Sequence, residues 1–313
     1  MLPKPRGEMS AAVFAAVQSG ATADLATAPE PESEEDAQIA LWALYELHYR
    51  GFEEVAADLE WDADLLRLRR GLERVFEEQL LGRWDHSAFR DDPELDLTGL
   101  IRGYDGPSLA RFVRRKADRA QVLEILRHRS IYHLKEADPT TWVIPRLETR
   151  AKAALMEIQF DEYGCGDPNR LHHHLFRRGM EAAGLRTEHA AYVDDAPVEI
   201  LAMNNALSMF GLHRRLRGAA IGHFAAFEST SSAPSRQLAQ GLRRLDFPDE
   251  MAAYYDEHVE ADSVHEQVAV RDLCGSFLDD EPSEGARVLF GAFTCLDLEA
   301  RYARRMLATW EVS

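Results

Sequence analysis

Residues 254–271, YYDEHVEADSVHEQVAVR, carry the most informative pattern in the chain. Asp262 follows His258 by four residues, and His265 follows Asp262 by three and His258 by seven. On a helix these offsets place the three side chains within a sector of roughly 60°. Two imidazoles beside a carboxylate suit a borderline metal such as Fe(II), whereas a softer thiolate site would need cysteine. The alternative interpretation is a solvated helix face, because such triplets also arise by chance in charged helices.

Three residues elsewhere have the chemical character needed to complete a two-metal centre. Glu162 lies near the end of LMEIQFDEYG, and His172 follows ten residues later, after a Gly-containing break. Glu228 closes the apolar segment AAIGHFAAFE, thirty residues before His258. An unpaired buried carboxylate is costly, and metal coordination is one way to offset that cost. A set of imidazoles and carboxylates with open positions can bind O2 at reduced iron.

Six imidazole- and carboxylate-bearing residues therefore follow one another in a defined order: Glu162, His172, Glu228, His258, Asp262 and His265. This order resembles the ligand pattern of the heme-oxygenase-like diiron oxidases, the iron-containing redox enzymes of natural-product biosynthesis. The phrases EIQFDEYGCG, GHFAAFESTSS and DEHVEADSVHEQ carry the resemblance, which covers roughly residues 131–271. It implies two irons per chain, reacting with O2 as Fe(II), with one carboxylate bridging them. It does not assign each histidine to an iron.

The register stays open at two positions, because the Gly break hides the helical phase. Asp161 and Glu157 compete for the role of the acid at position 162, and His173 and His174 compete for that of the imidazole at position 172.

Glu136, in SIYHLKEADPTTW, is a candidate additional ligand. It lies twenty-six residues before Glu162, and some members of the resembling family recruit an extra carboxylate there. The competing interpretation is an acid at the end of a helix. His223 is interpreted as a packing or surface residue, and the role of His133 is undetermined.

The rest of the chain predicts an all-α protein, a heme-oxygenase-like bundle of about nine helices in a single domain over residues 38–313. Residues 1–37 are expected to be an N-terminal extension and linker with a short helix, mobile over the Pro- and acid-rich residues 21–37. Ser33 and Asp36 resemble a capping box. The expected helices cover residues 36–52, 62–81, 108–137, 139–163, 167–185, 196–231, 235–245, 248–278 and 282–310, where residues 196–231 form one or two helices.

Composition excludes several classes of function. The chain has 313 residues with 54 acids against 36 bases, a formal charge of −18, which disfavours nucleic-acid binding. No apolar run approaches the roughly 18 residues that span a bilayer, so no membrane partner is expected. The three widely spaced cysteines suit a reducing compartment, and we expect a cytoplasmic protein.

Other metal proteins fit the sequence less well. A ferritin-like diiron site needs Glu-x-x-His on two helices, and none of the twelve histidines has Glu three residues before it. A heme oxygenase would use one proximal histidine near the start of the chain, where His48 stands, but the six-residue set would then have no purpose. His48 is instead interpreted as a core histidine. A metal-free hydrolase of the thiamin-salvage kind would rely on a cysteine such as Cys165.

The sequence therefore predicts an O2-dependent, non-heme diiron oxidase or oxygenase. Its substrate is expected to be a small metabolite bearing an amine or a carboxylate, and N-oxygenation is the preferred outcome. Oxidative C–C cleavage or desaturation on the same centre is the alternative. An unidentified electron donor is required, and a homodimer is compatible with the bundle. The alternative of another class is a metal-free helical binding or scaffold protein.

Overall fold

The computed structural model describes residues 1–85 and 93–311, without the side chains of residues 93–96 and 260–264. All regular elements within this part are helical, in agreement with the all-α prediction. The first half contains α1 (Glu8–Ser19), η1 (Thr22–Thr27), α2 (Glu34–Glu46), η2 (Ala57–Trp61), α3 (Ala63–Arg83), α4 (Pro93–Gly103), α5 (Leu109–Arg115), α6 (Arg119–His133) and α7 (Asp138–Thr141). The second contains α8 (Thr149–Glu162), α9 (His172–Ala182), α10 (Val198–Leu212), α11 (Arg217–Arg244), α12 (Asp249–Gln267), α13 (Ser276–Asp280) and α14 (Gly285–Thr309).

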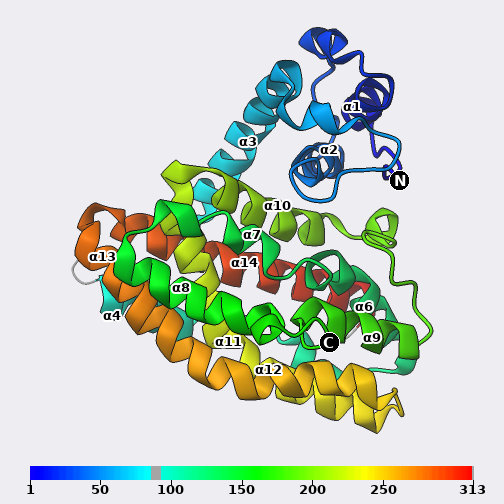
Figure 1. Ribbon diagram of the computed structural model, residues 1–313. Coiled ribbons are helices and arrows are strands. Elements are labelled where there is room, and N and C mark those ends of the chain that lie inside the picture. Colours follow the sequence, from blue (N-terminus) through cyan, green and yellow to red (C-terminus); the bar gives the residue numbers. More distant parts are fainter. Residues whose placement is uncertain (86–92, 312–313) are drawn as a thin grey trace.

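The N-terminal segment is packed, not an open connector. α1 lies against α2, and Figure 1 shows both with α3 at one end of the molecule, opposite α12. The Ser33 hydroxyl accepts a hydrogen bond from the Asp36 amide, as the capping pattern predicts. The Asp36 carboxylate is used elsewhere, accepting from the amides of Met9 and Ser10. Burial of Leu25 and Asp36 ties residues 21–37 to the fold. The domain boundary at residue 37 stays a prediction.

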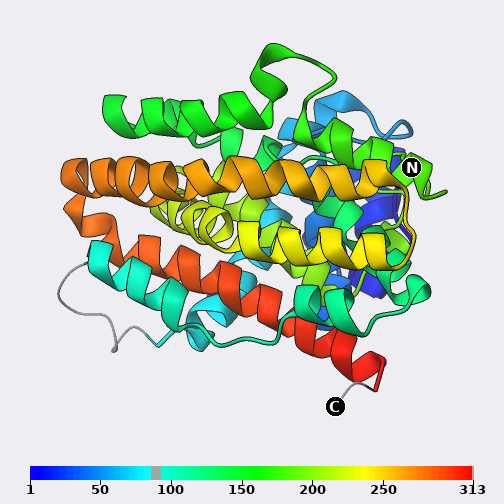
Figure 2. The ribbon, with the colours of Figure 1, turned by 90° about the horizontal axis from the view of Figure 1, so that it is seen from below.

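The central helix pair is α11 and α14, which cross at close range. A methyl group on Gly222 would lie 1.8 Å from the Val288 carbonyl oxygen, and one on Gly291 would lie 1.9 Å from that of Ala219. Only glycine allows this approach of two backbones. Gly222 and Gly291 therefore let α11 and α14 pack closely. Figure 2 shows α12 beside α11, with α14 on the other side of α11.

Several expected helix boundaries are wrong. The helix expected over residues 108–137 is two helices, because Asp118 and Gln121 form a capping box that starts α6. Conversely, residues 217–244 form one helix, α11, with Pro234 inside it. Asp167 does not start α9, since its carboxylate accepts from the Asn169 amide in a turn. The described residues contain fourteen α-helices, because the split at Asp118 and the additional helices α1, α4, α7 and α13 add five to the nine expected.

The helix expected over residues 248–278 is continuous but changes its winding. After α12 the chain forms a π-helix, η8 (Val268–Gly275), and then α13. η8 packs against α8 and α11. Wider π-helical turns inside helices often occur near functional sites, and this one directly follows the segment that carries His265.

Among the described residues, no helix combines the length and the apolar character needed to cross a bilayer.

Candidate metal centre

A tight loop between α8 and α9 brings Glu162 and His172 face to face. Glu162 is the last residue of α8, and His172 is the first of α9. Gly164 and Cys165 between them both have positive φ, 71° and 54°. A Cβ on Gly164 would lie 2.6 Å from the Leu171 amide nitrogen, so this reversal requires glycine. The reversal leaves His172 Nδ1 3.0 Å from Glu162 Oε2, with both side chains buried.

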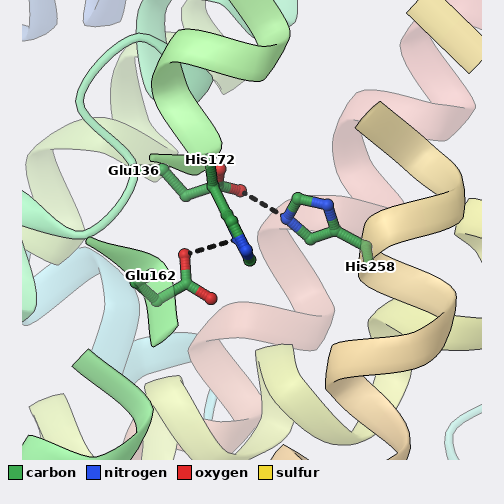
Figure 3. Close-up of side chains that lie close together, drawn as sticks. All are labelled: Glu136, Glu162, His172 and His258. Atoms are coloured by element: carbon green, nitrogen blue, oxygen red, sulfur yellow. Dashed lines mark ion pairs between the residues drawn. The ribbon is translucent and has the colours of Figure 1, made fainter. Parts of the chain in front are cut away.

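His258 and Glu136 complete a first group around this pair (Figure 3). His258 lies on α12, and Glu136 lies in the turn between α6 and α7. The Nε2 atom of His258 is 3.5 Å from Glu136 Oε1. Its Nδ1–H donates to the Tyr254 carbonyl at 2.8 Å, so Nε2 is the nitrogen directed toward the group. Glu136 is thus buried within the cluster and is not an exposed acid at a helix end.

A second group consists of Glu162, Glu228 and His265. Glu228 comes from α11, and its Oε2 is 3.3 Å from His265 Nδ1. The Nε2–H of His265 donates to Asp161 Oδ2 at 3.1 Å, which directs Nδ1 toward the two glutamates. Asp161, which competed with Glu162 in the sequence, therefore orients a histidine instead of joining the group.

The two groups overlap at Glu162. Within each group, one nitrogen or oxygen atom from every residue lies within 4.8 Å of the others. Ligands bound at about 2 Å from one ion lie within about 4 Å of each other, so a small inward movement of these side chains would let each group hold a metal. The side chain of Asp262 lies outside the described residues, and its place in the centre stays a prediction.

The electrostatics favour a cation at the centre. Burial raises the pKa of the Glu136 carboxyl, but His133 and His258 outweigh burial and hold it well below its usual value. Burial lowers the pKa of His265, yet the hydrogen bond to Glu228 and the nearby acids raise it to about 9. Glu162 Oε2 and His172 Nδ1 are buried and 3.0 Å apart without hydrogen-bond alignment. Carboxylates and imidazoles placed in this way are better suited to bind a metal ion than to form hydrogen bonds with one another.

A small chamber of about 10 Å³ adjoins the two groups. Space of this size holds about one water-sized molecule. Besides the carboxylates and His258, its walls are Tyr132, Ala137, Phe224 and Phe227. The ring of Tyr132 packs edge-on against Phe227, with centroids 5.4 Å apart. Burial and the three nearby glutamates raise the pKa of the Tyr132 phenol well above its usual value, so the hydroxyl retains its proton.

The remaining candidates lie outside both groups. Glu157 is exposed, and His173 and His174 are only partly buried. His223 is buried with its ring 6.2 Å from that of Phe210, and burial lowers its pKa to about 4.

His48 and Cys165, the candidate residues of other protein classes, belong to neither group. His48 is a core residue whose ring faces Glu60 and Arg69, which fits the sequence interpretation. Cys165 is exposed and donates to Asp161.

The family of iron-containing redox enzymes matches residues 123–300, more than half of the chain. The chain belongs to this family. The match spans α6 through most of α14 and so includes every described member of both groups. As a member of the iron-containing redox enzymes it is an oxidoreductase with an all-α, heme-oxygenase-like fold. No curated protein matches the chain.

The sequence analysis did not identify two tyrosines next to the site, Tyr132 and Tyr254. Tyr254 precedes His258 by four residues, and Tyr132 precedes Glu136 by four. This spacing places each tyrosine on the same helical side as the following residue when the chain is helical. It is a usable signal, but aromatic residues at helical spacing most often indicate core packing alone.

Proposed function

We propose that this protein is an O2-dependent, non-heme diiron oxidase or oxygenase. The observation that carries the proposal is the pair of overlapping buried groups that share Glu162. Glu136, His172 and His258 would hold one iron, and Glu228 and His265 would hold the other, with Glu162 shared by both groups. Asp262 is a further proposed ligand from the sequence pattern. Fe(II) bound there supplies the electrons and the open positions at which O2 reacts.

The chain itself orients the donors and limits access. The Tyr254 carbonyl accepts a hydrogen bond from one ring nitrogen of His258, and the Asp161 carboxylate accepts one from His265. In each histidine the opposite ring nitrogen then faces the site. Aromatic walls formed by Tyr132, Phe224 and Phe227 exclude bulk water from the chamber. Because the chamber holds only about one water-sized molecule, binding of a metabolite requires movement of these side chains.

Within this class we propose N-oxygenation of a small amine-bearing metabolite. The described lining of the chamber contains three glutamates and three aromatic rings, and neither lysine nor arginine. This lining offers no lysine or arginine to bind a substrate carboxylate, which favours an amine as the reacting group. Oxidative C–C cleavage and desaturation on the same centre remain alternatives. An external electron donor, a cytoplasmic location and a homodimer also belong to this proposal.

Metal uptake tests the class of function. Anaerobic titration with Fe(II) should saturate near two irons per chain, and exposure to O2 should then consume O2 with a transient change in visible absorption. His258→Ala and His265→Ala should each lower the uptake, whereas His174→Ala, outside both groups, should leave it unchanged. A wild-type protein without uptake, or uptake unaffected in both variants, would support the metal-free scaffold instead.

Product analysis tests the reaction. A panel of small amines and amino acids should be incubated with the iron-loaded protein, a reductant and isotopically labelled O2. N-oxygenation predicts a hydroxylamine or nitro product carrying the labelled oxygen on nitrogen. Shortened or desaturated products that carry no labelled oxygen on nitrogen would contradict N-oxygenation and support one of the two alternative reactions.

A further inference from the structure

Tyr254 contacts two members of the first group, and these members come from different elements. Its hydroxyl donates to Glu136, with distances of 2.9 Å to Oε1 and 3.0 Å to Oε2. Its carbonyl accepts from His258 Nδ1 at 2.8 Å. One residue on α12 therefore connects the turn after α6 with the histidine one helical turn further along α12.

The Tyr254 ring is held firmly enough to act as an anchor. Its side chain is 1% exposed. The ring packs edge-on against Phe176, with centroids 4.9 Å apart, and against His258 at 4.4 Å. The hydroxyl also lies 2.8 Å from His133 Nδ1, which itself contacts Glu136 at 3.0 Å. Tightly packed rings lose their rotational freedom during folding, so the hydroxyl stays in place at no further entropic cost when a ligand binds.

Glu136 needs such an anchor more than the other carboxylates do. It lies in a turn, whereas Glu162 and Glu228 belong to helices whose backbones are set by regular hydrogen bonds. A carboxylate on a turn with several rotatable bonds would otherwise sample many positions. Partners that orient a metal ligand commonly contribute 10- to 100-fold to metal affinity.

We propose that Tyr254 is a positioning residue, which presets the Glu136 carboxylate and the His258 ring for one metal ion. The proposal rests on the proposed function, since it assumes that this group binds metal. It assigns the hydroxyl to Glu136 and the carbonyl to His258. Replacement by phenylalanine removes only the first contact.

The experiment compares Tyr254→Phe with Tyr255→Phe and the wild type. Tyr255 is a matched control, because it is the next residue, is also buried, and has no described hydrogen bond to Glu136. Each protein is titrated anaerobically with Co(II), whose visible absorption reports the ligand geometry of each occupied site, and then with Fe(II). Thermal unfolding of the metal-free proteins shows whether all three are folded alike.

We expect the wild type and Tyr255→Phe to bind two ions with the same affinities. Tyr254→Phe should bind one of them about 10- to 100-fold more weakly, with a changed Co(II) spectrum for that site. In a Glu136→Ala background, Tyr254→Phe should cause no further loss, because the hydroxyl then has no carboxylate to position.

Three results would overturn the proposal. Unchanged affinities in Tyr254→Phe would show that the hydroxyl positions nothing. Equal weakening by Tyr254→Phe and Tyr255→Phe, or a full further loss in the Glu136→Ala background, would show a general packing effect. These results leave metal binding by the wild type intact, whereas a wild type without any uptake would overturn the proposed function together with this inference.

Discussion

In two buried clusters of this protein, the negative charge of the carboxylates is neutralised in different ways. The first, here called the ionic cluster, consists of Glu46, Lys135 and His189. The Glu46 side chain is fully buried, and its two oxygens lie 3.0 Å from Lys135 Nζ and 2.7 Å from His189 Nε2. Lys135 also lies over the ring of Tyr49 at 4.4 Å. This carboxylate has a permanent cation of the protein as its partner.

The second cluster is the candidate metal centre, which has carboxylates but no such permanent cation among its described members. The ion-pair partners described for Glu136, Glu162 and Glu228 are histidines, whose positive charge depends on bound protons. Lys135 directly precedes Glu136 in sequence but points to Glu46. The comparison teaches that burial of acids alone does not indicate a metal site. The informative feature is burial of several acids without lysine or arginine to neutralise them.

The largest expected effect is that of Glu162→Ala, since Glu162 belongs to both groups. Fe(II) uptake should fall from about two ions per chain to below about one, because each ion loses a ligand. Anaerobic titration with a colorimetric iron assay measures this. Glu157→Ala is the control, an exposed acid on the same helix, and should retain full uptake. If Glu162→Ala still binds two ions, the metal centre lies elsewhere.

Next in size is the effect of Glu46→Gln on stability. Lys135 would remain buried without its carboxylate, and breaking a buried ion pair from one side costs about 3–5 kcal/mol. Urea unfolding of the metal-free proteins gives the change in the free energy of unfolding. Glu35→Gln, an exposed position on α2, should change it by less than about 0.5 kcal/mol. A cost below about 1 kcal/mol for Glu46→Gln would mean that the ionic cluster contributes little.

The ionic cluster also predicts a pH dependence. Burial raises the pKa of Glu46, but Lys135 and His189 outweigh it and lower the pKa from 4.5 to about 2. A lowered folded-state pKa stabilises the protein above the unfolded-state value, and this contribution is lost as pH falls through the folded-state value. Between pH 4.5 and 2 the wild type should lose up to about 3 kcal/mol more than Glu46→Gln. Parallel curves for the two proteins in chemical unfolding would contradict this.

The smallest expected effect, counted for each site, is stabilisation by metal. Fe(II) at about 100 times its dissociation constant should raise the free energy of unfolding by about 2.7 kcal/mol for each site. Anaerobic thermal unfolding should show a higher midpoint, reversed by a chelator. Glu46→Gln should gain as much as the wild type, and Glu162→Ala should gain much less. An equal gain in Glu162→Ala would show that the stabilising ion binds at another place.

The sequence was sufficient for the fold class, because helical periodicity and capping residues are local properties. Ser33 caps α2 as its spacing predicts. The order of imidazoles and carboxylates also pointed to the iron-containing redox enzymes, since a residue pattern along the chain persists whatever the exact helix boundaries are. The boundaries themselves were less predictable, as the break at Asp118 and the continuous α11 show.

Tertiary structure alone decided which acids and imidazoles meet. Asp161 and Glu162 are neighbours in the sequence, yet one orients His265 from the edge and the other lies between the two groups. Glu46 and Glu136 are both buried acids, but Lys135 forms an ion pair with Glu46 because of how α2 packs against its neighbours. Contacts of this kind join residues 89 to 143 positions apart, and local periodicity contains no information about them. Charge balance in a protein interior is a property of the folded chain, because it depends on which side chains share a space from which water is excluded.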